Sequence, residues 1–262
     1  MFIMSNTLTE VEKKVKKKVG HILRVPKVWF RHLSEPEEPY RYIFHHIPKC
    51  AGTSAFDALT HWFICIKDYP PSRAWGNVDD PKAYDQFCNS SKNLEQLRHY
   101  QILCGHYHLK GSFISERYPS CFEKDRYRLI TFLRDPLEVQ ISLYYYERRM
   151  KRFPPEEPLE KRLLERENYL ASVIPCDDSN YQEVLNRYFF IGLVEKYQES
   201  FDRLADQLRK PRLQLTTLNQ SVRDEQKLSE DFLSEFQERN RLDYQLYHYA
   251  KSLYEKNDRS VD

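Results

Sequence analysis

The stretch Tyr42-Ile-Phe-His-His-Ile47-Pro-Lys-Cys-Ala-Gly-Thr-Ser54 decides how this chain of 262 residues folds. Its first six residues are rich in aromatic and β-branched side chains, and the proline that follows ends the run, which is typical of a short buried strand. Phe56, Leu59 and Phe63 then recur at helical spacing. The stretch therefore predicts a strand, a tight loop and an amphipathic helix.

The loop of this unit, Lys49 to Ser54, has the composition of an anion site. Gly52 allows the backbone to approach a ligand, and the first N–H groups of a helix have no partner within the helix. The helix dipole favours an anion at the same point. Lys49 adds a mobile charge, and Thr53 and Ser54 add hydroxyl donors. We interpret the loop as a cradle for phosphate or sulfate, with an ordinary strand-to-helix turn as the alternative.

Composition limits the classes of protein to consider. The chain is 40% hydrophobic and 31% charged with a net charge of +2, so its length suits one α/β domain and any basic site must be local. The longest apolar run, Trp62–Ile66, is too short to span a membrane and reads as part of a helix. The first thirty residues lack the apolar centre of a signal peptide, and the six cysteines lack metal-ligand spacing. We therefore expect a cytoplasmic protein without a metal site.

The chain divides into two parts. Residues 1–41 form a peripheral basic segment and linker, and residues 42–262 form the main domain. The segment is rich in lysine between positions 13 and 18, which allows weak association with a membrane surface or a partner. A solvated basic face is the plainer interpretation.

A second predicted strand ends beside a histidine. Gln101–Cys104 reads as a buried strand, and Gly105-His106-Tyr107-His108 follows it. Ligands of open parallel sheets bind at the carboxyl ends of strands, and histidine is easily tuned to accept a proton near neutral pH. His106 is thus a candidate base, with a purely structural histidine as the alternative.

A third strand, at residues 128–133, leads into a second candidate anion site. Asp135 is a predicted helix N-cap, Pro136 takes the first helical position, and Glu138 closes a capping box. Ser142 follows two helical turns after Asp135 on the same face, so its hydroxyl can share a ligand with Arg134. An arginine fork and a hydroxyl above a helix N-terminus predict a phosphate site.

The remaining elements complete an α/β domain. We predict a single domain with an open, mainly parallel sheet of about five strands flanked by helices. The further strands are expected at 189–194 and 213–216, the further helices at 197–208 and 242–253, and a long loop without clear periodicity at 67–93.

The two anion motifs resemble a known family. Ile47–Ser54 and Phe132–Glu138 with Ser142 look like the paired 5′ and 3′ motifs of sulfotransferases that use 3′-phosphoadenosine 5′-phosphosulfate (PAPS), closest to the glycan (heparan-type) O-sulfotransferase branch. The resemblance implies a P-loop-like unit in which Lys49, Cys50, Ala51, Gly52, Thr53 and Ser54 hold the 5′-phosphosulfate. It also implies that Arg134 and Ser142 hold the 3′-phosphate.

Gly105-His106 resembles the Gly-His that carries the base in that branch. Phe190–Glu195 and Asp243–Tyr247 are similar to weaker family signatures. The chain departs from the family at Cys50-Ala51, where Thr-Gly is usual, and at Val139, where many members have arginine. The first departure removes one hydroxyl but no backbone donor.

The resemblance implies transfer of a sulfuryl group from PAPS to an acceptor hydroxyl, with a carbohydrate as the expected acceptor. His106 would take the acceptor proton and Lys49 would neutralise the leaving phosphate, without a metal and without nucleic acid as a partner. His108 or a glutamate are alternatives for the base. The rival functions are a nucleotide-dependent kinase, for which the lysine stands on the wrong side of the glycine, and a non-catalytic nucleotide- or polyanion-binding protein.

Overall fold

A computed structural model describes residues 27–28, 38–71, 81–109, 111–215 and 227–256. Its centre is a five-stranded sheet in the order β2-β3-β1-β4-β5 with every neighbouring pair parallel. The strands are β1 (Arg41–His45), β2 (Ile64–Asp68), β3 (Gln101–Gly105), β4 (Tyr127–Leu133) and β5 (Phe190–Leu193). The predicted open parallel sheet is confirmed.

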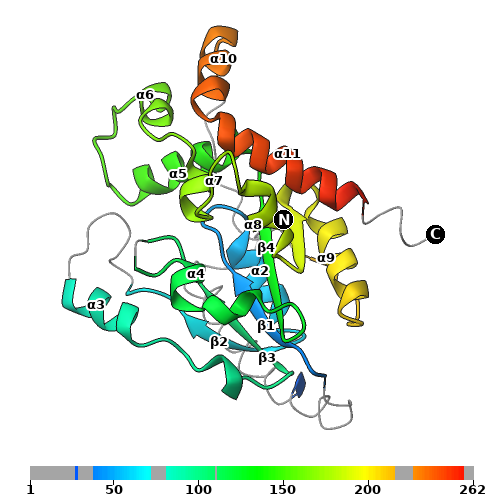
Figure 1. Cartoon of the computed structure of the whole chain (residues 1–262). Helices are drawn as coiled ribbons and strands as arrows, with labels where there is room; N and C mark the ends of the chain where they lie inside the picture. The colour runs from blue at the N-terminus through cyan, green and yellow to red at the C-terminus, as the bar shows by residue number, and fades with distance from the viewer. Residues whose placement is uncertain (1–26, 29–37, 72–80, 110, 216–226, 257–262) are drawn as a thin grey trace, which may run out of the picture.

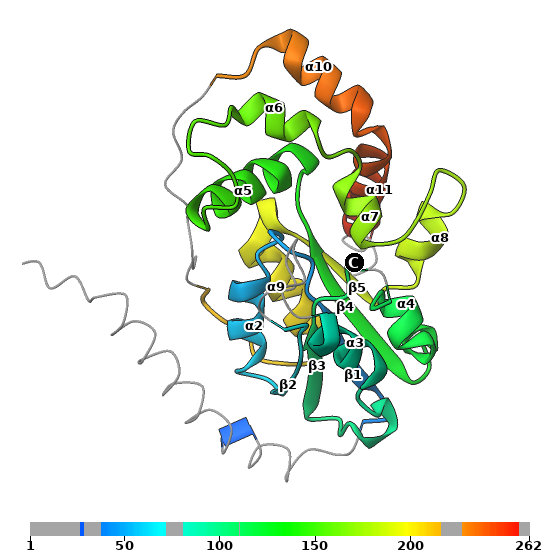
Figure 2. The same cartoon turned by 90° about the vertical axis from the view of Figure 1, so that its left-hand side faces the viewer.

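Helices cover both faces of this sheet (Figures 1 and 2). One face carries α2 (Gly52–Leu59) and α9 (Tyr197–Gln207). The other carries α4 (Ile114–Arg117), α7 (Tyr169–Val173), α8 (Tyr181–Asn186) and α11 (Arg241–Lys256). Along β1, Ile43 packs on the second face and Phe44 on the first, both at most 1% exposed. Strands covered on both faces explain why the sequence shows continuous apolar runs rather than alternation.

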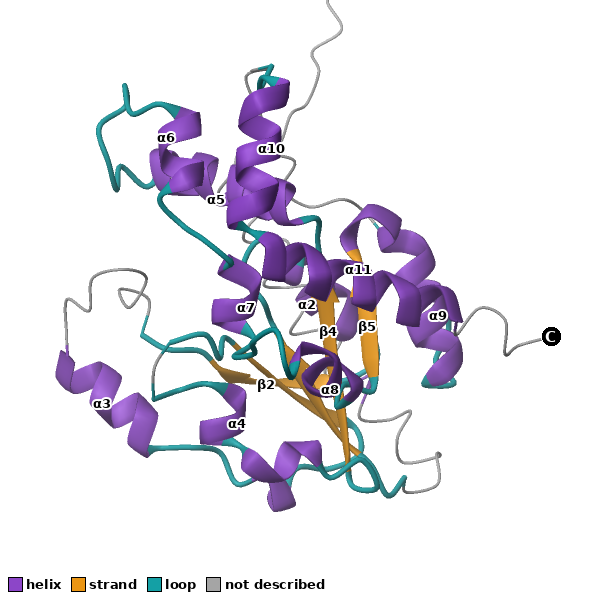
Figure 3. Ribbon diagram, turned by 45° about the horizontal axis from the view of Figure 1, so that its top comes forward, coloured by secondary structure: helices purple, strands orange, loops and turns teal. Residues whose placement is uncertain are grey.

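A third apolar cluster lies beyond the carboxyl ends of the strands. Helix α5 (Pro136–Arg149) starts directly after β4 and packs with α6 (Leu159–Leu164) and α10 (Glu230–Arg239). Tyr144, Leu163 and Phe236 are its buried centre. Figure 3 shows these three helices gathered at one end of the molecule, away from the middle of the sheet.

The stretch expected as a long loop contains a helix. Helix α3 (Pro81–Asn89) lies within residues 67–93, and residues 72–80 are outside the described part of the chain. Arg117 anchors it: the guanidinium makes two 2.8 Å bonds to the Asp68 carboxylate and also donates to the main-chain oxygens of Phe87 and Ser90. Short 3₁₀ turns, η1 (Leu94–Gln96), η2 (Pro119–Phe122) and η3 (Val194–Lys196), complete the connections.

Two predicted elements are wrong. Trp62–Ile66 is not helical, because α2 ends at Leu59 and the alternating Ile64 and Ile66 enter the edge strand β2. Residues 213–215 do not form a strand, and residue 216 lies outside the described part. Their backbone pairs instead with a side chain: the Gln198 amide donates to the Leu213 oxygen and accepts from Leu215 N. The side-chain amide of Gln198 thus makes the two hydrogen bonds that a neighbouring strand would make in a sheet.

The predicted helices at 197–208 and 242–253 are confirmed as α9 and α11. Strand β1 begins at Arg41, and the lysine-rich segment between positions 13 and 18 lies outside the described residues. Across the described helices, none combines the length and apolarity needed to cross a membrane.

Candidate active site

Three predicted motifs lie together at the carboxyl ends of the three central strands. Strands β3, β1 and β4 are direct neighbours, with Phe44 opposite both Cys104 and Ile130. Their carboxyl ends lead into His106, the 49–54 loop and Arg134 respectively. The chain leaves β1 toward β2 and leaves β4 toward β5, so the strand order reverses between β1 and β4. A crevice at such a reversal is where open α/β sheets bind ligands.

The backbone of the 49–54 loop has the form of an anion nest. Lys49 and Ala51 have positive φ angles of 67° and 55°, and Cys50 between them does not. Alternating φ signs turn successive N–H groups toward one point. Both Ser54 N and Ala55 N donate to the Ala51 oxygen at 3.0 Å, so the amides of Gly52 and Thr53 precede the first bonds inside α2.

The side chains of this loop divide into exposed and buried ones. Thr53 is exposed, whereas Ser54 is 8% and Cys50 only 1% exposed. Burial raises the pKa of the Cys50 thiol, so it stays protonated, and the Cys50 amide donates to the Ile47 oxygen at 3.3 Å. The Lys49 ammonium lies 4.5 Å from the centre of the Tyr146 ring on α5. The lysine therefore bridges the loop and α5.

The reason for Gly52 differs from the one expected. A Cβ atom at this position would meet Cδ2 and Nε2 of His46 at 1.7 and 1.8 Å. The space above Gly52 that we assigned to a ligand is therefore occupied by an imidazole on that side. At Gly52 a ligand can therefore contact only the main-chain N–H group.

His106 has a defined tautomer. Its Nδ1 lies 2.7 Å from the main-chain oxygen of His46, and a carbonyl oxygen only accepts. In the neutral ring the proton is thus on Nδ1, and Nε2 is the acceptor. Burial, followed by the nearby His46 and His108, lowers the pKa of His106 well below its usual value. The ring is neutral at pH 7, as a general base must be.

His108, the alternative base, stays close. Its ring centre is 5.5 Å from that of His106, in an edge-to-face arrangement. Burial lowers the pKa of His108 to about 4. Both rings are therefore neutral at pH 7, and only substitution can separate their roles.

The second anion motif is preformed but differs in one detail. Asp135 caps α5 by accepting from Leu137 N and Glu138 N at 3.0 and 3.2 Å, as predicted. The Asp135 amide, however, donates to Glu195 at 2.8 Å, so Glu138 does not close a capping box. Glu138 instead forms an ion pair of 2.7 Å with Arg134, its charge partner one turn away.

Ser142 is less accessible than expected. It is 6% exposed on the buried face of α5, and among the described hydrogen bonds none joins it to Arg134. Val139 is fully buried, which explains an apolar side chain at that position.

Sequence reasoning missed the role of three side chains. His46 contacts both the loop and His106, and its Nδ1 lies 3.1 Å from the Tyr69 hydroxyl. Glu195 joins the two weaker signatures, since it accepts from Asp135 N and from the Tyr247 hydroxyl at 2.9 Å. The sequence contained Glu195 and Tyr247 in the quoted stretches, but only the fold brings them together.

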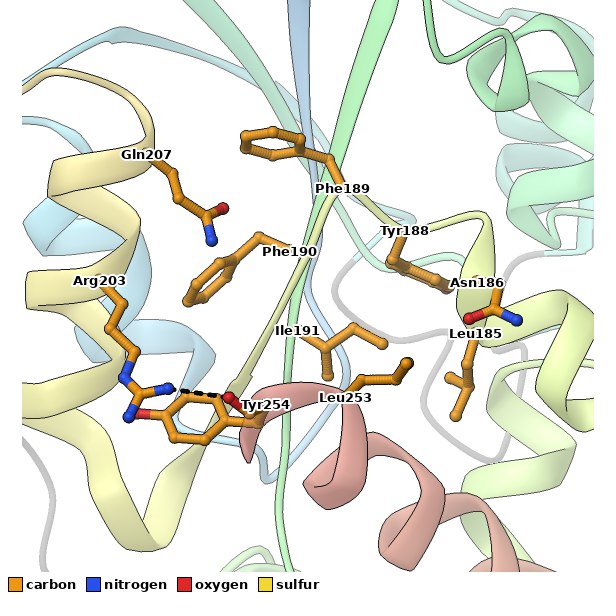
Figure 4. Close-up of a pocket in the computed structure, with 10 residues that line it drawn as sticks. All are labelled: Leu185, Asn186, Tyr188, Phe189, Phe190, Ile191, Arg203, Gln207, Leu253 and Tyr254. Atoms are coloured by element: carbon orange, nitrogen blue, oxygen red, sulfur yellow. Dashed lines mark hydrogen bonds between the residues drawn. The ribbon is translucent and has the colours of Figure 1, made fainter. Parts of the chain in front are cut away.

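A cavity of about 230 Å³ lies elsewhere, at the start of β5 (Figure 4). It lies between α9 and the end of α11, and on one side of it Arg203 donates to the main-chain oxygen of Tyr254 at 2.8 Å. None of the predicted site residues lines it. Within the described residues, no group of three or more His, Cys, Asp or Glu side chains is arranged to hold a metal ion.

Comparison with models of known protein families gives no match, and no curated protein matches the sequence. Among solved structures, the chain is similar to a sulfotransferase from Alicyclobacillus acidocaldarius with a TM-score of 0.46 and 14% sequence identity, over 82% of this chain and 95% of that one.

Proposed function

We propose that this chain transfers a sulfuryl group from PAPS to an acceptor hydroxyl, with a carbohydrate as the acceptor class. The observation that carries the proposal is the order of groups along three adjacent strands. A neutral imidazole follows β3, a nest with a lysine follows β1, and an arginine at a capped helix start follows β4. A donor with two separated anionic groups matches the last two, and an acceptor hydroxyl matches the first.

The donor is expected to lie across the carboxyl ends of β1 and β4. The nest amides and Lys49 would hold the 5′-phosphosulfate, since preorganised N–H groups and a cation stabilise such oxygens. The 3′-phosphate would bind Arg134 on the other side. The Arg134–Glu138 ion pair orients the guanidinium beforehand, and the phosphate must compete with that carboxylate.

Transfer is then a single displacement at sulfur. Nε2 of His106 accepts the acceptor proton while the acceptor oxygen forms a bond to sulfur. The bond between sulfur and the bridging phosphate oxygen breaks, and its electron pair stays on the departing 3′,5′-bisphosphate. Lys49 neutralises the charge that develops on that oxygen. Positioning and charge stabilisation account for most catalysis in transfers of this type.

A transfer assay tests the proposal. The protein is incubated with PAPS and a panel of sulfated and unsulfated glycans, phenols and aliphatic alcohols, and products are analysed by mass spectrometry. We expect a sulfated glycan product together with one equivalent of 3′-phosphoadenosine 5′-phosphate (PAP). Arg134→Ala serves as the matched control with a weakened donor site. Transfer of a phosphoryl group from ATP by the same preparation would instead favour the kinase.

A further inference from the structure

The His46 ring fills the space between the 49–54 loop and His106. Its Cδ2 and Nε2 atoms lie where a methyl group on Gly52 would be, and its centre is 4.1 Å from the centre of the His106 ring. One imidazole therefore touches both the loop on β1 and the candidate base on β3. Neither contact was expected from the sequence.

This ring is held from its other sides as well. Its Nδ1 lies 3.1 Å from the Tyr69 hydroxyl, and it stacks with Phe44 at 5.7 Å between ring centres. Moving the ring away from Gly52 would break the contact with Tyr69 or press it on His106. The rigid imidazole ring of His46 thus sets the distance between the loop and His106.

We propose that His46 is a positioning residue for sulfuryl transfer: its ring sets the distance between the loop that holds the sulfuryl group and His106. This inference rests on the proposed function. The His46 carbonyl already orients the His106 ring by accepting from Nδ1. The side chain adds the spacing, and a misplacement of 1 Å in a catalytic site can cost roughly a hundredfold in rate.

The ring acts through its shape rather than its charge. Burial lowers the pKa of His46 to about 3, with His45, His108 and Lys49 adding to the effect, so the imidazole is neutral at pH 7. A planar ring without nitrogen atoms should therefore serve nearly as well. A variant with such a ring therefore distinguishes a role of His46 in spacing from a role in proton transfer.

The first test compares His46→Ala with His46→Phe. For each variant we measure turnover, the Michaelis constant for PAPS, and the dissociation constant for PAP. His46→Ala is expected to lower turnover by roughly ten- to a hundredfold with PAP affinity unchanged, whereas His46→Phe keeps most of the turnover. Equal losses in the two variants would overturn the spacing role in favour of a chemical one, and two silent variants would overturn it altogether.

The second test uses Gly52→Ala, alone and combined with His46→Ala. The added methyl meets the ring in the wild type, so Gly52→Ala should destabilise the protein and lower turnover. In the His46→Ala background the same change should have little further effect, because coupled residues are not additive. Additive losses of melting temperature would overturn the contact. This thermal readout is independent of activity, so failure of the wild type to bind PAP would refute the proposed function and leave the contact testable.

Discussion

The Nδ1 atom of His106 lies 2.7 Å from the main-chain oxygen of His46, and the His46 amide donates back to the Gly105 oxygen at 2.9 Å. These two bonds clamp the ends of β3 and β1 together just beyond the last paired residues, His45 and Gly105. The clamp keeps the proton of the neutral His106 ring on Nδ1 and leaves Nε2 as the acceptor. The candidate base is thereby oriented by a main-chain oxygen, which substitution of neighbouring side chains does not remove.

The clamp leads to a prediction about the base. His106→Ala should lower turnover by roughly a hundredfold or more with PAP affinity nearly unchanged, as is typical on removing a general base. The control is His108→Ala, because the His108 ring packs edge-to-face on that of His106. Its turnover should fall much less. Both are measured at saturating PAPS. A silent His106→Ala beside an inactive His108→Ala would reverse the assignment, and two silent variants would move the base to a carboxylate.

Lys49 is expected to act on the transition state. Lys49→Ala should reduce turnover more than donor affinity, because charge on the leaving phosphate oxygen develops during transfer. The comparison is between turnover and the dissociation constant of PAP. Tyr146→Leu is the matched control, since it removes the ring beside the Lys49 ammonium and keeps the charge. An unchanged turnover with a raised Michaelis constant would show that Lys49 only binds.

Glu195 is expected to hold the second anion motif in shape. Glu195→Ala removes the acceptor of both Asp135 N and the Tyr247 hydroxyl, and each lost bond costs about 1 kcal/mol. Because Asp135 follows Arg134 directly, PAP affinity should fall together with the melting temperature. Tyr247→Phe removes one of the two bonds and should have the smaller effect on both. Equal effects would show that Glu195 acts through Tyr247 alone.

Acid should destabilise the protein through its buried histidines. Burial lowers the pKa of His45 and of His46 to about 3 and that of His108 to about 4, below the value of 6.5 in the unfolded chain. Their stabilising contribution is present above pH 6.5 and is lost as pH falls toward the folded values. The fully buried His45 alone can account for at most about 2 kcal/mol between pH 7 and pH 5.

Asp243 acts in the opposite direction. Burial raises its pKa to about 6, so its contribution is present below the usual value and lost as pH rises through 6. One carboxyl group is outweighed by several imidazoles, and the melting temperature should therefore fall by several degrees from pH 7 to pH 5. His45→Leu should flatten this dependence. A melting temperature that rises toward pH 5 would contradict the account.

The sequence predicts those features that depend on local patterns. Four of the five strands, the cap at Asp135 and both long C-terminal helices follow from periodicity and capping residues. The fifth strand is not predicted because its apolar start, Ile64 to Ile66, is separated by only four residues from the end of α2 and continues the apolar run of that helix. The Arg134–Glu138 pair follows from i,i+4 spacing at the start of a helix. The role of Glu195 depends on a contact with Asp135, 60 residues away, and the ring above Gly52 depends on how the loop folds back on the end of β1. Spacing along the chain does not encode such contacts.

The most direct test of the account is a calorimetric titration with PAP and, separately, with ATP and magnesium. PAP carries the 3′-phosphate expected at Arg134, and ATP does not. We expect PAP to bind clearly more tightly than ATP. We also expect Arg134→Ala to lose roughly ten- to a hundredfold in PAP affinity, because charge-assisted hydrogen bonds contribute about 1.5 to 3 kcal/mol. Equal affinity for the two nucleotides, or PAP binding that is unaffected by Arg134→Ala, would contradict it.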